Sequence, residues 1–431
     1  MSEAVSEDPP TSDFYRWYVL GVLVVVYIFN FIDRSILGIL LEPIKQDLGA
    51  SDTAMGFLGG IAFAAFYTVL GIPIARLADK GVRRNVIAIS LTIWSAATAI
   101  CGLTQNFVQL LIARMGVAVG EAGGSPPSHS MISDLFPPEK RATALAIYAL
   151  GIPIGSMIGN LGGGWINEWF DWRTAFFVVG LPGVALALFV RFTVREPPRG
   201  VAEGLEVREE TPPVTEVLKH LWSLHSFRYM SVAGSFHAFV GYGVALWIPA
   251  MFSRSHGLST GEMGTALFYL GFASVAGTLL GGWLGDRFGA GDARWYMWIP
   301  GIATLAALPF SLFSYLWSDP TVALWGLAIP YVLGAYWLAP TFAMTQGLVG
   351  LRMRALAAGI LLFVVNIFGM GVGPQFVGIL SDIFQNTTAL GVDSLRWALV
   401  VSLIFSLFAA ILYWLAARTL REDLARAKEL G

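Results

Sequence analysis

The sequence contains few charged residues and almost no cysteine. Of its 431 residues, 13% are charged and a single one, Cys101, is a cysteine. Because an ordinary soluble domain carries about 25% charged residues, this composition argues against a soluble globular fold. One cysteine cannot form an internal disulfide, so a fold held together by disulfide bonds is excluded.

The sequence also lacks the motifs of enzymes. No cluster of His, Cys, Asp and Glu has metal-ligand spacing, and no glycine-rich loop follows a strand pattern. The segment GGSPPS (123–128) ends an apolar helix, so it does not predict a phosphate site. We therefore expect no enzymatic activity, no cofactor or metal, no nucleic-acid partner and no ATP-driven step. The first residues are acidic, and we expect no cleaved signal peptide.

Hydrophobic residues are abundant and make up 56% of the chain. Apolar runs of 18 or more residues recur along its whole length, which is the pattern of membrane-spanning helices. They predict an all-α membrane protein with twelve transmembrane helices. The expected spans are 15–41, 54–78, 85–104, 106–130, 141–166, 173–194, 227–252, 262–285, 294–316, 321–348, 354–383 and 393–418.

A segment rich in proline and charge separates the sixth span from the seventh. Such a segment is typical of a linker between two domains. The expected division is a tail (1–14), an N-domain (15–194), a linker (195–226), a C-domain (227–418) and a second tail (419–431). The end of the linker, residues 214–224, predicts a short amphipathic helix at the membrane interface.

The two halves of the sequence look like repeats of each other. Asp79 and Asp286 each begin a short, basic, glycine-containing loop after the second span of their half. Two six-helix halves repeated in parallel, related by a pseudo-two-fold axis, are the architecture of one class of transporters.

Lysine and arginine are distributed unevenly between the loops. The loops on the side of the N-terminus hold most of them, whereas the opposite loops hold only Lys45, Arg173, Arg254 and Arg396. Positive residues concentrate on the cytoplasmic side of a membrane. Both termini and the linker should therefore be cytoplasmic, and we expect a multi-pass protein of a bacterial inner membrane.

Four charged residues lie well inside the first and fourth expected spans. Arg114 and Glu121 are seven positions apart in segment 106–134, so they share one helix face and are separated by about 10 Å along the axis. Asp33 and Arg34 lie in the first span, and Asp33 is expected at the depth of Arg114. Charges inside a membrane helix are costly and normally face a protein interior or a water-filled cavity.

This set of charges predicts a protonation switch. A buried carboxylate favours its neutral form unless a cation is near, so proton binding can be coupled to helix movement. We expect Asp33 and Glu121 to carry protons and Arg114 to act as their counter-ion. Arg34 should bind an anionic group of the substrate. The alternatives are buried ion pairs that only fix helix register and, for Arg34, a side chain that reaches the interface.

The second half of the sequence offers few charges and several aromatic residues. His237 is a second candidate for titration, although a lone histidine is more often simply hydrogen-bonded. With Arg34, Arg114 and Glu121, the candidate substrate contacts are His237, Tyr242, Trp247, Tyr331 and Trp337. Each aromatic residue could instead be ordinary packing. A charged first half facing an apolar second half suits an amphipathic molecule with an anionic head.

Three segments resemble the major facilitator superfamily. The loop after the second span, with Ala75 where that family has glycine, is similar to its signature through Asp79, Lys80, Gly81, Arg83 and Arg84. The other two are the element from Arg114 to Glu121 and the glycine- and proline-rich segment 151–165. The resemblance implies a central cavity lined by the first and fourth helices, so that Asp33, Arg114 and Glu121 can meet.

The signature loop also predicts a conformational latch. A carboxylate at the end of the second span can pair with arginines and with the N-terminus of a neighbouring helix. The residues assigned to the latch are Asp79, Lys80, Arg83 and Arg84, with Asp286 and Arg287 as a weaker counterpart. The alternative is that these charges only set the topology.

A narrower resemblance, to the Spinster family, lies in segments 30–80 and 113–155. It implies a bacterial-type homologue that moves lysophospholipids or sphingosine 1-phosphate-like lipids by alternating access, with protons as the coupling ion. The expected partners are a lipid-like or organic-anion substrate and membrane lipids, and the expected state is a monomer. A proton-linked carrier of small organic anions, a drug exporter and a receptor-like sensor are the alternatives.

Overall fold

The computed structural model describes residues 12–198, 213–350 and 353–429. Within these ranges the regular elements are helices, and twelve of the helical segments are long and apolar enough to cross a membrane. The twelve expected spans are thus confirmed in number. Residues 1–11 and the centre of the linker (199–212) lie outside the described residues, so the exact segment boundaries stay a prediction.

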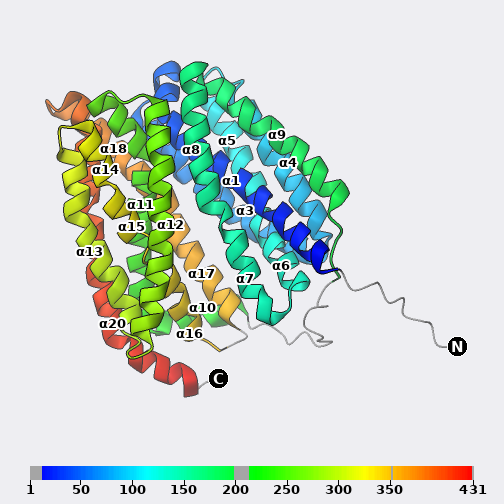
Figure 1. Ribbon diagram of the computed structural model, residues 1–431. Coiled ribbons are helices and arrows are strands. Elements are labelled where there is room, and N and C mark those ends of the chain that lie inside the picture. The colour runs from blue at the N-terminus through cyan, green and yellow to red at the C-terminus, as the bar shows by residue number, and fades with distance from the viewer. Residues whose placement is uncertain (1–11, 199–212, 351–352, 430–431) are drawn as a thin grey trace.

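The first half comprises helices α1 to α9 (Figure 1). Their bounds are α1 Asp13–Leu48, α2 Asp52–Gly59, α3 Ile61–Lys80, α4 Arg83–Cys101, α5 Phe107–Glu121, α6 Ser125–Leu135, α7 Pro138–Ala149, α8 Gly151–Trp169 and α9 Trp172–Thr193. Three of the six spans are composed of two consecutive helices, namely α2 with α3, α5 with α6 and α7 with α8.

The second half is built in the same way. Its helices are α10 Val214–Ser223, α11 His225–His256, α12 Thr260–Gly289, α13 Trp295–Leu316, α14 Pro320–Gly326, α15 Ala328–Leu333, α16 Leu338–Gly347, α17 Arg354–Asn366, α18 Gly373–Thr387, α19 Ser394–Ser402 and α20 Ile404–Glu429. A π-helical turn, η2 Ile367–Val372, joins α17 to α18, and a short 3-10 turn, η3 Gly391–Asp393, precedes α19.

The first helix is longer than its hydropathy predicts. The apolar run ends near Leu41, but α1 continues through Pro43 to Leu48 and stops at Gly49, which has a left-handed φ of 61°. Glu42 and Lys45 are therefore helical residues beyond the apolar run. Asp33 and Arg34 consequently lie about two helical turns farther from the end of the helix than expected.

The fourth span was expected to be one helix, and this is wrong in detail. It breaks after Glu121, and α6 begins at Ser125. At the break, glycines allow α4 to approach closely, since a Cβ at Gly120 would clash with Trp94 and a Cβ at Gly123 with Ser90. Glycine at such a contact is typical of packed membrane helices.

The amphipathic helix expected at the end of the linker is confirmed as α10. Val217 and Leu221 are buried, and His220 Nε2 lies 3.2 Å from the carbonyl oxygen of Leu348. The helix packs against α11 and α17 of the second half.

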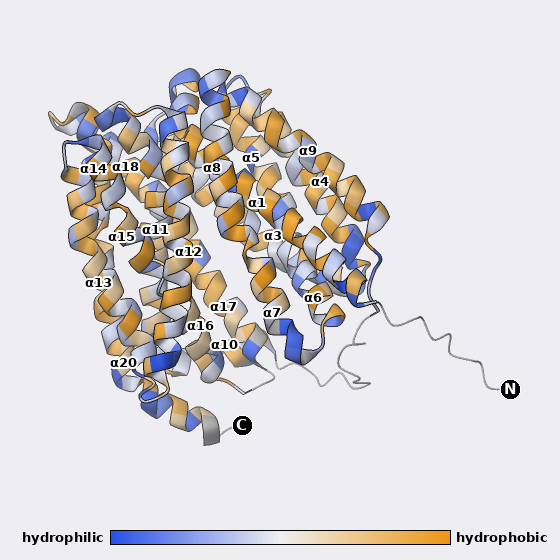
Figure 2. Ribbon diagram, viewed as in Figure 1, coloured by the Kyte–Doolittle hydropathy of each residue, from blue (hydrophilic) through white to orange (hydrophobic). Residues whose placement is uncertain are grey.

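Figure 2 shows that hydrophobic residues dominate the length of the bundle, whereas hydrophilic residues gather at its two ends. Both ends of the described chain lie at one of these ends, which we call the termini face (Figure 1). The other end is called the opposite face. Loops at these two faces border an apolar band, as expected for a membrane-spanning bundle.

The two halves contact each other through a few helix pairs. These are α1 with α11, α2 with α18, α8 with α12, and α3 with η2 and α17. Among the described residues, the hydrogen bonds between the halves all lie towards the opposite face. The halves are therefore joined by polar contacts at one end of the molecule.

Candidate functional site

An ion pair joins the first and fourth spans inside the first half. Arg34 of α1 donates from Nε to Oε2 of Glu121 at 2.6 Å, and the Glu121 side chain is fully buried. Glu121 is the last residue of α5, just before the break in the span. The long α1 places Arg34 deep enough to reach this carboxylate, so Arg34 does not lie at the membrane interface.

Asp33 faces a different neighbour. Its carboxylate accepts a hydrogen bond from Thr98 Oγ1 at 2.5 Å, and Arg114 donates to its carbonyl oxygen at 3.4 Å. The structure thus brings Asp33 and Arg114 together, as predicted. Arg114 contacts the main chain of Asp33 rather than its carboxylate, so the role of Arg114 as a counter-ion stays a prediction. Adjacent residues of a helix point about 100° apart, so Asp33 faces α4 while Arg34 faces α5.

Aromatic rings surround the two arginines. The Arg34 guanidinium lies 4.5 Å from the ring centre of Tyr67 and 5.1 Å from that of Phe31. Phe63 lies below both cations, 5.5 Å from Arg34 and 5.3 Å from Arg114. Cation–π contacts stabilise charge where water is excluded, so these rings help to keep both guanidinium groups inside the bundle.

A central cavity of about 260 Å³ lies between the two halves. The first half contributes Arg34 and Arg114 to its wall, and the second half contributes Tyr242, Leu246 and Tyr331. The cations therefore face a wall that is apolar except for two phenols. This division between the halves was predicted from the sequence.

A second cavity of about 240 Å³ lies inside the second half. His237, Tyr315 and Leu308 line it, and it shares Ala245 and Tyr331 with the wall of the central cavity. Its lining is mostly apolar. The two cavities therefore adjoin each other at α11 and α15.

His237 is hydrogen-bonded on both ring nitrogens. Nε2 lies 2.8 Å from the carbonyl oxygen of Gly334, and Nδ1 lies 3.0 Å from Thr304 Oγ1. A carbonyl only accepts, so Nε2 carries a proton and donates it to Gly334. His237 is thus a hydrogen-bonded wall residue of the second cavity.

The two tryptophans assigned to the substrate site do not line either cavity. Trp247 is fully buried and donates from Nε1 to the carbonyl oxygen of Pro374 at 2.8 Å. Trp337 packs on the ring of His237, at 5.2 Å between ring centres. Residue 247 lies about 140° around the helix from Tyr242, so the two cannot both face the cavity. In this structure neither ring reaches a cavity wall, and the assignment of Trp247 and Trp337 to the substrate site stays a prediction.

The signature loop contacts its own half. The buried Arg83 bonds Asp134, Ser130 Oγ at 2.8 Å and Glu196 Oε1 at 2.7 Å. The backbone N–H of Arg84 donates to the other oxygen of Glu196 at 2.9 Å. Glu196, which sequence reasoning missed, therefore ties the start of the linker to the N-terminus of α4.

The other residues assigned to the latch lie at the ends of α3 and α12. Lys80 and Arg287 are exposed, and Asp286 accepts from the Tyr296 hydroxyl at 3.3 Å within the second half. The side chain of Asp79 lies outside the described part of the structure. The latch, which would act in another conformation, stays a prediction.

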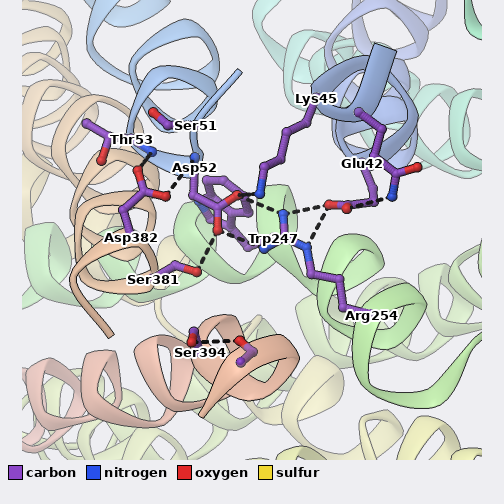
Figure 3. A network of polar contacts seen from close by, with 12 residues as sticks. Glu42, Lys45, Ser51, Asp52, Thr53, Trp247, Arg254, Ser381, Asp382 and Ser394 are labelled. Carbon is purple, nitrogen blue, oxygen red and sulfur yellow. Dashed lines mark hydrogen bonds and ion pairs between the residues drawn. The ribbon is translucent and has the colours of Figure 1, made fainter. Parts of the chain in front are cut away.

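A cluster that sequence reasoning missed joins the halves at the opposite face (Figure 3). Arg254 of α11 donates from both terminal nitrogens to Asp52 of α2, at 2.7 Å each, and from Nε to Glu42 at 2.7 Å. Lys45 Nζ is 2.7 Å from Asp52. We call Glu42, Lys45, Asp52, Arg254, Ser381 and Asp382 the opposite-face cluster.

The cluster also includes a helix cap supplied by the other half. Asp382 of α18 accepts from the backbone N–H groups of Asp52 at 3.1 Å and Thr53 at 2.7 Å. A carboxylate at a helix N-terminus is favourable because it meets unpaired N–H groups and the helix dipole. The signal in the sequence was that Lys45 and Arg254 are two of the few cations in the opposite loops.

A glycine-lined seam between α8 and α12 provides a further contact between the halves. A Cβ at Gly164 of α8 or Gly264 of α12 would clash with the facing backbone. Beside them, Gly261 donates to Glu168 Oε2 at 2.8 Å, and Asn167 donates to Thr260 Oγ1 at 3.0 Å. The seam and the opposite-face cluster together close this end of the central cavity.

Comparison with known proteins identifies the fold. The family model described as Major Facilitator Superfamily matches residues 23–374. The chain shares 32% sequence identity with a protein of known crystal structure. That protein is a bacterial homologue of the human lysosomal transporter Spinster, in an inward-facing and unoccupied conformation. That match covers 96% of this chain and 99% of the other, with a TM-score of 0.86.

Two curated relatives agree with this. An MFS-type efflux pump of Mycolicibacterium smegmatis is 37% identical over 95% of this chain and 94% of its own length. Protein spinster homolog 1 of Xenopus tropicalis is 25% identical over 96% of this chain and 83% of its own. Members of this superfamily are transporters rather than enzymes and typically need no cofactor. The chain therefore belongs to the major facilitator superfamily and is a secondary transporter of the Spinster type.

Proposed function

We propose that this transporter couples proton movement to the transport of amphipathic anionic lipids, of the lysophospholipid or sphingosine 1-phosphate kind. The single observation that carries the proposal is the pair of adjoining cavities. The central one presents Arg34 and Arg114, and the second one is mostly apolar and shares Tyr331 with it. A phosphate would meet the guanidinium groups, which match its geometry, while the hydrocarbon chain enters the second half.

The ion pair of Arg34 with Glu121 supplies a physical route for coupling. An anionic headgroup that binds Arg34 competes with Glu121 for the same guanidinium. A buried carboxylate that loses its counter-ion is costly, so Glu121 takes up a proton when substrate is bound. Asp33, which lacks a guanidinium partner on its carboxylate, is the second proposed carrier.

We propose that the termini face is cytoplasmic and that the protein resides in a bacterial inner membrane. The uneven distribution of Lys and Arg supports this orientation. With the opposite face closed by its polar contacts, the structure then corresponds to the inward-facing state of the cycle.

The test is uptake of a radiolabelled lysophospholipid into proteoliposomes, with and without a pH gradient. We expect gradient-driven uptake in the wild type and its loss in Glu121→Gln. Glu216→Gln, an exposed carboxylate on α10, is the matched control and should behave as wild type. Equal gradient-driven uptake in wild type and Glu121→Gln would contradict the coupling role.

A second candidate function is export of other compounds, which is favoured by the relative named an MFS-type efflux pump. A small organic anion would use the two arginines but leave the second cavity empty. Val244→Trp, which fills that cavity, should therefore abolish lysophospholipid uptake and spare a small anion. Transport of small anions alone, in wild type, would favour the second candidate.

A further inference from the structure

A third hollow lies on the outer surface of the second half, apart from both cavities described above. It is a groove of about 280 Å³ between α13 and α20, lined among others by Trp298, Ile302 and Leu305 of α13 and by Leu407, Ile411 and Trp414 of α20. We call it the α13/α20 groove. It shares no lining residue with the other two cavities.

Small residues create this groove. Gly301 and Ala410 form part of its lining, and a Cβ at Gly301 would lie 3.2 Å from Cβ of Tyr413. The larger side chains at the edges are exposed, with Ile302 at 59%, Ile411 at 54% and Trp414 at 50%. An exposed apolar groove on a membrane span faces lipid chains rather than water.

The groove begins at the termini face, and arginines stand at that end. The Arg418 guanidinium lies 3.6 Å from the ring centre of Trp414, and that of Arg294 lies 4.9 Å from the ring centre of Trp298. Tryptophan at the end of a span marks the level of the lipid headgroups. The two cations are therefore placed at headgroup height, directly beside the apolar groove.

This rim has more positive than negative charge. Asp292 pairs with Arg294 at 3.0 Å and with Arg421 at 2.6 Å. Among the described residues, no carboxylate lies within ion-pair distance of Arg418. Two of the three guanidinium groups thus share one carboxylate, and Arg418 keeps its donors for a ligand.

We propose that the α13/α20 groove binds one anionic phospholipid of the adjacent leaflet. An acyl chain lies in the groove between Ile302 and Ile411, and the phosphate contacts Arg418 and Arg294. The charge of the rim selects an anionic lipid, and guanidinium groups suit the phosphate. The site is separate from the transport pathway, because its lining faces outward from the bundle.

The test is native mass spectrometry of the purified full-length protein, titrated with phosphatidylglycerol or phosphatidylcholine. We expect one tight phosphatidylglycerol in the wild type. Arg418→Gln should weaken it about fivefold, which is the worth of one cation near an anionic membrane surface. Ala410→Phe, which fills the groove, should also remove this lipid.

Arg191→Gln provides the matched control. Arg191 is an exposed arginine in the last turn of α9, the corresponding span of the first half, and its substitution should leave lipid binding unchanged. Size-exclusion chromatography verifies that each variant is folded, and Arg418→Gln tests the site at the surface if Ala410→Phe fails to fold. Equal binding of phosphatidylcholine, unchanged binding in Arg418→Gln, or a dimer that Ala410→Phe dissociates would each overturn the proposal.

Discussion

The contacts of Arg34 depend on the exact depth of this residue in the membrane. Its guanidinium bonds Glu121 at 2.6 Å and lies against the rings of Tyr67 and Phe31. The sequence identified Arg34, Glu121, Asp33 and Arg114 as a functional group because charges inside spans are rare. It could not give the pairing, because one turn of helix α1 decides which carboxylate each arginine reaches.

Removing one member of the ion pair between Arg34 and Glu121 should lower the stability of the protein more than removing both. Arg34→Gln leaves Glu121 buried without its counter-ion, which should lower the free energy of unfolding by about 3–5 kcal/mol. The double variant Arg34→Gln/Glu121→Gln has no uncompensated charge and should recover most of this loss while remaining inactive. Thermal unfolding in detergent, combined with lysophospholipid uptake, measures both effects. A double variant less stable than Arg34→Gln would contradict the pairing.

The ends of the helices were the features hardest to predict from the sequence. The twelve apolar runs predicted the spans, but hydropathy cannot follow α1 beyond Leu41, where the residues become polar and the backbone stays helical. The opposite-face cluster was missed for the same reason, because Glu42 and Lys45 were read as loop residues. Its cap, in which Asp382 bonds the start of α2, depends on how two distant helices pack.

Weakening the opposite-face cluster should open that side of the transporter. Arg254→Gln removes the bonds to both Asp52 and Glu42, so the halves should separate there more often. A cysteine placed at Ser156, which lines the central cavity, should then react faster with a membrane-impermeant maleimide added at the opposite face. Arg396→Gln is the control, because Arg396 pairs with Asp393 of its own half at 3.2 Å. Equal labelling in the two variants would refute a gating role.

The start of α9 offers a prediction about pH. The backbone N–H of Thr174 donates to Asp171 at 2.6 Å and lowers the pKa of this carboxyl, and Arg173 lowers it further. The pKa is lower in the folded state, so this stabilisation is present above the unfolded value of about 3.9 and is lost as pH falls through the folded value. Asp171→Ala should cost about 1 kcal/mol at neutral pH and less in acid.

Thermal unfolding of wild type and Asp171→Ala at neutral pH and near pH 3 measures this difference. Asp171→Asn retains an N-cap acceptor and should show little pH dependence of its own. A constant gap between wild type and Asp171→Ala across this range would exclude a role for the ionised carboxylate.

At the scale of the whole molecule, the two-half architecture was predictable because each half repeats the same pattern of spans and basic loops. The conformation could not be predicted from the sequence, because it depends on which contacts between the halves are made. In the described part of the structure the polar contacts between the halves are those of the opposite-face cluster and the glycine seam, which lie at the same end.

A covalent link across the seam should therefore stop transport without preventing binding. Cysteines at Asn167 and Thr260, whose side chains bond each other at 3.0 Å, can be joined by a short bifunctional reagent. The native Cys101 is fully buried and should not compete. We expect lysophospholipid uptake to cease while binding from the termini face persists, and each single-cysteine variant should stay active. Unimpaired uptake after complete cross-linking would show that the seam need not open.

Because the polar bonds between the described parts of the two halves all lie near one end, the halves can rotate relative to each other about that end. Helix α1, with 36 residues, is about 54 Å long. The far end of α1, at Asp13, is about 44 Å from Glu42 in the opposite-face cluster, so a tilt of about 10° around the cluster would move it by about 8 Å. A small shift of one hydrogen-bonded group in the opposite-face cluster can thus produce a movement several times larger at the termini face, where the cavity opens or closes.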